Sequence, residues 1–128
     1  MIDKLMAQIA GHENSPAEDV FENIQVLKGL TAAAFVRRMD DYGKALGYRC
    51  TNCHVAGDFA SDSLQGKRTA RTMSIIVADI NAQEMPKMSA TRPPQISCMT
   101  CHHGMNQPSR NVDGALQALN APPKPPGL

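Results

Sequence analysis

The sequence has few of the large side chains from which a protein core is normally built. Its 128 residues include no tryptophan, three phenylalanines and two tyrosines, against nine prolines and nine glycines. No apolar run approaches the ~18 residues of a membrane span, so no transmembrane segment is expected. Thirteen Lys and Arg balance twelve Asp and Glu, which argues against nucleic-acid binding. The length predicts about one domain, with a thin core that something other than side chains helps to fill.

The four cysteines occur in two copies of one pattern. Each copy reads C-x-x-C-H, with Cys50, Cys53 and His54 in the first and Cys98, Cys101 and His102 in the second. This is the attachment sequence for c-type haem. Two thiols three residues apart can reach both vinyl groups along one porphyrin edge, and the following histidine can coordinate the iron. The sequence therefore predicts two covalently bound c-type haems.

Two other uses of four cysteines are open. Two C-x-x-C pairs can hold one zinc ion as four thiolates, although that pattern expects about 15–20 residues between the pairs, and here Cys53 and Cys98 are 45 positions apart. Two short disulfides would suit a secreted protein. Both alternatives leave the trailing histidines without a role, so the haem interpretation is favoured.

Haem attachment by thioether bonds predicts an extracytoplasmic protein, in the periplasm or at the cell surface. Residues 1–10 lack the apolar stretch of about 7–15 residues that a signal peptide needs, so we expect the export signal to be absent from this sequence. Ile2, Leu5, Met6 and Ile9 have helical spacing. They predict a short amphipathic helix that either packs on the core or docks on a partner.

Two longer helices are predicted farther along the chain. Thr31 is a candidate N-cap for a helix through Leu46, with Gly47 as its C-terminal stop. A second helix is predicted from about Lys67 to Ala82, and the three prolines between residues 85 and 95 are expected to break it. The remaining expectations are a turn over 13–18, a mixed segment over 20–30, a loop over 55–66, a short helix over 112–119 and a polyproline tail over 122–126.

Each predicted long helix carries a methionine on its apolar stripe and precedes a C-x-x-C-H segment. Met39 lies with Phe35, Tyr42 and Leu46 on the first stripe, and Met73 lies on the second. A Met thioether can occupy the sixth position of haem iron and raise its potential, but methionine is also a common core filler. Spacing alone leaves the choice open. Other candidate ligands are Met6, Met85, Met88, Met99, Met105, His12 and His103.

Residues 20–104 resemble the cytochrome subunit of purple-bacterial photosynthetic reaction centres and its non-photosynthetic relatives. The resemblance covers about two thirds of the chain and is carried by residues 20–27, 35–39, 45–49, 58–62 and 67–81. In that family a helix supplies an axial Met, and a turn and the C-x-x-C-H segment follow. The resemblance implies that Met39 and Met73 complete the iron coordination of His54 and His102. It also implies that Arg71 pairs with a haem propionate through charge-assisted bonds.

This sequence departs from the family in two respects. The reaction-centre subunit has four haems in two pairs, whereas this chain has one pair of C-x-x-C-H segments, and it has no N-terminal cysteine for lipid attachment. The resemblance therefore implies the fold and the electron-transfer role more strongly than a photosynthetic partner.

We expect an all-α fold with extensive loops, in which a helix–turn–C-x-x-C-H repeat occurs twice and two haems fill the core. Residues 1–19 form the N-terminal helix and linker, 20–110 the dihaem cytochrome c domain, and 111–128 a short helix and Pro-rich tail. The expected function is electron relay between redox partners, such as a membrane electron-transfer complex, a reaction centre or another cytochrome, without catalysis. The alternatives are a dihaem peroxidase-like enzyme with one open iron, and a haem-stacking subunit of a larger assembly, with oligomerisation through the N-terminal helix or the tail.

Overall fold

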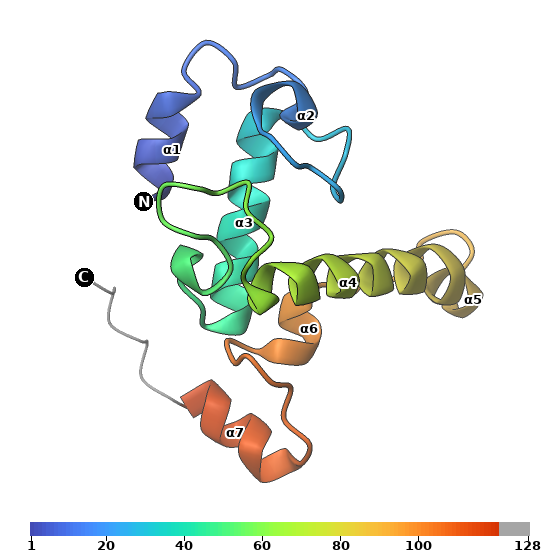
Figure 1. The fold of residues 1–128 in the computed structure, drawn as a ribbon. Helices are drawn as coiled ribbons and strands as arrows, with labels where there is room; N and C mark the ends of the chain where they lie inside the picture. The colour runs from blue at the N-terminus through green and yellow to red at the C-terminus, as the bar shows by residue number, and fades with distance from the viewer. Residues whose placement is uncertain (121–128) are drawn as a thin grey trace.

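The computed structural model describes residues 1–120, apart from the side chains of residues 115, 118 and 119, and the predicted polyproline tail lies outside that range. Over the described residues the chain folds into helices and loops, and the β-type pairing recorded there is two isolated bridges. This confirms the predicted helical class with extensive loops (Figure 1). None of the described helices is both long enough and apolar enough to cross a bilayer.

The helical elements follow one another along the chain with short or irregular connections. In order, they are α1 (Ile2–Gln8), α2 (Ala17–Val20), α3 (Ala32–Leu46), the 3₁₀ turn η1 (Cys50–Asn52), α4 (Gln65–Asp79), the π-helical turn η2 (Ile80–Glu84), α5 (Met85–Met88), α6 (Cys98–His102) and α7 (Val112–Asn120). The short helices predicted near residues 2–9 and 112–119 are confirmed as α1 and α7. The single turn α2 follows Pro16, in a segment predicted to be a turn or linker.

Helix α3 is the central element of the fold, and its predicted ends are confirmed. The Thr31 hydroxyl accepts a hydrogen bond from the Ala34 N–H at 3.3 Å, the expected N-cap interaction. Gly47 ends the helix in the left-handed conformation, with φ +63°. A side chain at Gly47 would also collide with the carbonyl of Gly104, so the end of α3 and the chain after α6 approach closely at this point.

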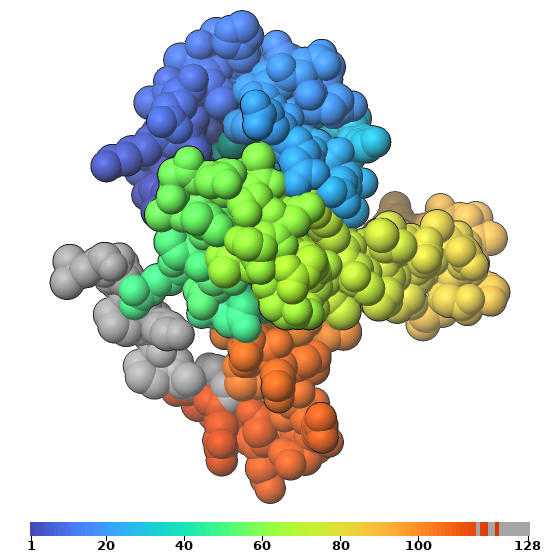
Figure 2. Space-filling model, viewed as in Figure 1, coloured from blue at the N-terminus to red at the C-terminus, as the bar shows by residue number. Residues whose placement is uncertain are grey.

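The second long helix extends past its predicted end at Ala82, although it does end within the predicted proline-containing segment, residues 85–95. Helical structure continues from α4 through η2 and α5 to Met88, as an arm that projects from the body (Figure 1 and Figure 2). Pro86 lies in the first turn of α5, where its missing N–H costs little. The π turn before it shifts the hydrogen-bond register. The helix instead ends at Ser89, where the backbone becomes extended.

Few apolar side chains are buried, as the composition predicts. Within the described part of the chain the buried apolar residues are Ile9, Ala17, Ala32, Val36 and Ala45, and no large side chain there is fully buried. Ile9, the residue after α1, packs with Ala32 and Val36 of α3, and Leu5 of α1 packs against this cluster, so α1 packs on the protein's own core. The accessible surface is 8953 Å², against about 6,600 Å² expected for a compact protein of this mass. The polypeptide thus exposes about a third more surface than a compact protein of its mass.

Candidate functional site

A cavity of about 1900 Å³ lies beside α3 and the first C-x-x-C-H segment. Five of the predicted site residues line it: Met39, Cys50, Cys53, His54 and Arg71. Its volume exceeds the roughly 300–1,000 Å³ of ordinary small-molecule pockets, so a group as large as a porphyrin can be accommodated. The other predicted site residues do not line this cavity: Met73, Cys98, Cys101 and His102.

Both C-x-x-C-H segments begin with a single helical turn that is capped in the same way. The side chain of Asn52 accepts the N–H of Arg49 at 2.8 Å, and the side chain of Thr100 accepts the N–H of Ser97 at 2.9 Å. In each case a residue between the two cysteines caps the residue that precedes them. A helical turn places positions three apart on one side, so the two thiols of each pair are presented together.

The histidines of the two segments share a hydrogen-bond arrangement that the sequence did not predict. Nδ1 of His54 lies 3.0 Å from the carbonyl oxygen of Phe59, and Nδ1 of His102 lies 2.9 Å from that of Met105. An imidazole that donates from Nδ1 to a carbonyl keeps its Nε2 lone pair for a metal. The ring of His54 also stacks on Phe59, with centroids 5.0 Å apart. Both histidines are therefore oriented as axial ligands would be.

Burial shifts the pKa values of several site residues, and the cysteines are not grouped to hold a zinc ion. Burial lowers the pKa of His54, which favours the neutral imidazole that can bind a metal. Burial raises the pKa of the Cys53 and Cys98 thiols, so the reactive thiolate forms are disfavoured. All four cysteines are free, and no three His, Cys, Asp or Glu side chains in the described part of the chain are grouped to hold a metal ion. The four-thiolate zinc alternative thus has no geometric basis.

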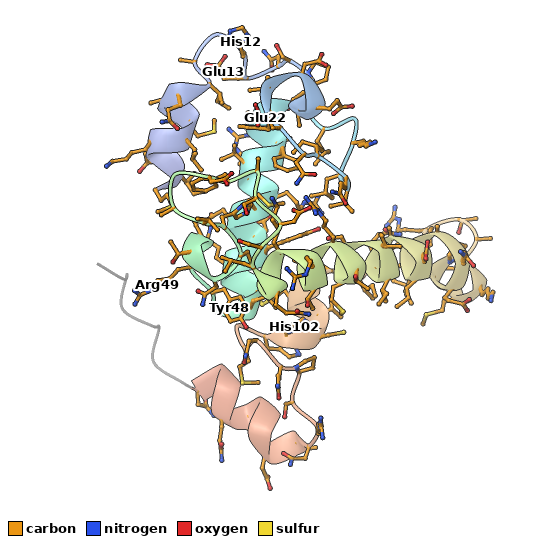
Figure 3. All side chains as sticks on the ribbon, viewed as in Figure 1. His12, Glu13, Glu22, Tyr48, Arg49 and His102 are labelled. Carbon is orange, nitrogen blue, oxygen red and sulfur yellow. The ribbon has the colours of Figure 1, made fainter. Side chains whose placement is uncertain are left out.

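The second C-x-x-C-H segment packs at the C-terminal end of α3, the end that leads into the first segment. Helix α6 contacts α3, the N–H of Gly104 donates to the carbonyl of Ala45 at 2.8 Å, and in Figure 3 His102 lies beneath α4. His102 is buried. Met73 is half-buried on α4, whereas Ile75 and Ile76 beside it are exposed. Whether Met73 meets His102 across a bound group stays a prediction.

Arg71 lines the cavity and takes part in a polar network around Asp62. The Arg71 guanidinium lies 2.8 Å from the Asp62 carboxylate and donates to the carbonyl of Asn23 at 3.0 Å. Asn23 and Lys67 also contact the carboxylate, at 3.0 and 3.2 Å. Five N–H donors are available on an arginine, so this pairing leaves others for a propionate. The predicted propionate contact of Arg71 stays a prediction.

The Asp62 network predicts a loss of stability in acid. Hydrogen bonding to Arg71 above all, and to Asn23 and Lys67, holds the pKa of Asp62 well below its usual range. Its contribution is therefore present above the unfolded pKa of about 3.9 and is lost as the pH falls toward the lower folded value. We expect the Asp62→Asn variant to be less stable than the wild type at neutral pH, with the difference shrinking below about pH 4. Denaturant unfolding of both proteins from pH 7 to pH 2 measures this, and a constant difference over that range would contradict the assignment.

The chain is similar in sequence to several known cytochromes. The chain is 35% identical over 103 residues to cytochrome c-554 of Chloroflexus aurantiacus, covering 79% of this chain and 24% of that protein. It is 33% identical over 90 residues to the photosynthetic reaction center cytochrome c subunit of Thermochromatium tepidum (69% and 22%), and 34% identical over 98 residues to that of Roseobacter denitrificans (73% and 26%). The chain thus spans about a quarter of the length of these relatives.

The names of these relatives support the expectation that the chain is not an enzyme, since all three are cytochromes. Residues 3–117 match the family described as photosynthetic reaction centre cytochrome C subunit. The match includes both C-x-x-C-H segments and the two long helices that precede them. The chain therefore belongs to the photosynthetic reaction centre cytochrome c subunit family.

Proposed function

We propose that this chain is a dihaem c-type cytochrome that relays electrons between redox proteins. Family membership implies covalently bound haem c, and two C-x-x-C-H segments give a count of two. The observation that carries the proposal is the repeated orientation of His54 and His102, each with Nδ1 on a backbone carbonyl. Neither a disulfide nor a zinc site at the cysteine pairs would require both histidines to have this same orientation.

The first haem is assigned to the cavity beside α3, and we place residues 20–110 in the dihaem unit. Cys50 and Cys53 would attach that haem, and His54 and Met39 would ligate its iron, because all four line the same cavity. By analogy, Cys98 and Cys101 would attach the second haem, with His102 and Met73 as ligands. When bound, such groups supply reversible one-electron chemistry. The polypeptide attaches them, fixes the histidine orientation and limits solvent access.

The partners that we propose are electron-transfer proteins outside the cytoplasm. Two of the relatives are named as subunits of a photosynthetic reaction centre, but this chain spans about a quarter of their length. A reaction centre is therefore one candidate beside another membrane electron-transfer complex or another cytochrome. A peroxidase-like activity needs an open iron, and no contact in the cavity favours one.

The haem count tests the proposal directly. We expect two haems per chain by pyridine haemochrome assay, retained in denaturing gels because the thioether bonds are covalent. The Cys98→Ala/Cys101→Ala variant should retain one. Both ferric haems should also show the weak long-wavelength absorption of sulfur ligation. A wild-type protein that matures with other cytochromes in the same host but carries no covalent haem would overturn the proposal.

A further inference from the structure

The carbonyl that orients His54 is shared with a buried cation. The oxygen of Phe59 accepts a hydrogen bond from Nδ1 of His54 at 3.0 Å and another from Nζ of Lys67 at 2.8 Å. A carbonyl oxygen has two lone pairs, so both donors can bind it at once. Lys67 thus reaches the predicted axial histidine through one shared acceptor.

Lys67 is held in this position by an unusually complete set of contacts. Its ammonium also donates to the carbonyls of Ala60 and Ser61, at 2.8 and 2.9 Å. Three consecutive carbonyls therefore take the three N–H donors of the lysine. The residue is only 8% exposed, although lysine is seldom buried to this extent unless it is paired. The structure thus holds a cation against the loop that orients His54.

The charges that face this loop leave a net positive charge. Asp62 is the acidic partner of both Lys67 and Arg71, with contacts of 3.2 and 2.8 Å. Asp58 is a second carboxylate of this loop and Arg68 a third cation bound to it, so two carboxylates and three cations leave an excess of one positive charge next to the first C-x-x-C-H segment. The lysine is the more buried member of its pair, with 10% of its side chain exposed against 38% for Asp62. Its field is therefore screened by water less than that of the carboxylate.

The second C-x-x-C-H segment provides a contrast within the same chain. Nδ1 of His102 donates to the carbonyl of Met105, and no lysine or arginine side chain among the described residues donates to that oxygen. The two predicted axial histidines therefore share an orientation but differ in what else their carbonyl acceptor binds. This difference between the two segments lies in the polypeptide and does not depend on the bound groups.

We propose that Lys67 is a positioning residue that raises the reduction potential of the first haem relative to the second; this rests on the assignment of His54 as an axial ligand. By binding the Phe59 carbonyl, Lys67 weakens the hydrogen bond from His54 and so reduces electron donation by the imidazole to the metal. Its positive charge also disfavours the oxidised iron, which carries one more positive charge than the reduced form. Both effects favour the reduced state.

The test compares Lys67→Met with Arg68→Met in the intact dihaem protein. Arg68 is the matched control because it donates to the carbonyls of Asp62 and Ser63 in the same loop, at 2.6 and 2.9 Å, but not to Phe59. Lys67→Met should shift the one-electron equilibrium of the first haem about tenfold toward oxidation, which is about 59 mV. Arg68→Met should shift it much less, and neither should move the second haem. Spectroelectrochemical titration with paramagnetic NMR assignment of the two haems gives these values.

A second measurement distinguishes an effect of Lys67 on the hydrogen bond of His54 from a purely structural role of Lys67 in supporting the loop. The NMR signal of the His54 Nδ1 proton should move downfield in Lys67→Met, because its hydrogen bond strengthens, and should stay in place in Arg68→Met. Lys67→Arg should keep the potential near the wild-type value. If Lys67→Met does not fold, Lys67→Gln tests the charge alone, since it removes the charge and keeps a donor: the potential of the first haem should still fall, while the Nδ1 proton signal should move little.

Two kinds of negative result can be distinguished, because one contradicts the role of Lys67 and the other contradicts the proposed function. Equal shifts in Lys67→Met and Arg68→Met, or no shift in either, would overturn the inference while leaving both haems and the proposed function intact. Absence of covalent haem at Cys50 and Cys53 in the wild type would instead overturn the proposed function, and this inference with it.

Discussion

Replacing Cys50 and Cys53 together with alanine is expected to abolish cooperative folding, because the first haem supplies much of the core. The buried apolar residues of the described chain are small or few, with Val36 and Ile9 the largest. The segments that line the cavity of about 1900 Å³ would pack against the first haem. Without that haem they would have little apolar surface to pack against. We expect a loss of about 5 kcal/mol or more, comparable to the total stability of a small domain.

Far-ultraviolet circular dichroism during thermal unfolding measures this effect. The wild type should show one sharp transition, and Cys50→Ala/Cys53→Ala a broad or absent one together with rapid proteolysis. Cys98→Ala/Cys101→Ala is the matched control, since it removes the second pair of attachment points while α1, α2 and α3 keep the first cavity intact. The control should therefore retain a cooperative, though weaker, transition. Equal losses in the two variants would show that the first cavity has no special role in the core.

The helices whose ends could be predicted are those with local stop signals. Thr31 and Gly47 bound α3 because a hydroxyl cap and a left-handed glycine act within one turn of the helix. The exact end of the second long helix could not be predicted, because Pro86 lies in the first turn of α5, after a π turn, and does not end the helix. A shift in hydrogen-bond register does not change the spacing of apolar residues along the sequence, so that spacing cannot predict it.

The site was predictable where covalent chemistry fixes the spacing of residues. Cys50, Cys53 and His54 follow from the reach of two thiols and one imidazole around a porphyrin, and the structure brings them to one cavity. The carbonyl partner of His54 could not be predicted, because it depends on how the loop around Phe59 folds back. The burial of Lys67 and its bond to the same carbonyl could not be predicted either, because both depend on the fold of this loop.

Replacing Met39 or Met73 with alanine is expected to open one iron while both haems stay attached. Attachment depends on the cysteines, whereas the thioether only occupies the sixth coordination position. Each variant should lower the potential of one haem by on the order of 0.1 V, a fraction of the roughly 0.8 V over which axial ligands set haem potentials. Each should also bind carbon monoxide at that haem, which the wild type should not.

Met99→Ala is the matched control, because Met99 is an exposed methionine within the second C-x-x-C-H segment and should leave both potentials and carbon monoxide binding unchanged. Met105 and His103 also line the first cavity, so they are the alternative ligands there. If Met39→Ala fails to bind carbon monoxide and Met105→Ala or His103→Ala does, the sixth ligand of the first iron comes from the loop after α6. The iron of the first haem would then be ligated by His54 from the first C-x-x-C-H segment and by a residue that follows the second. Helix α3 would line the cavity without supplying a ligand.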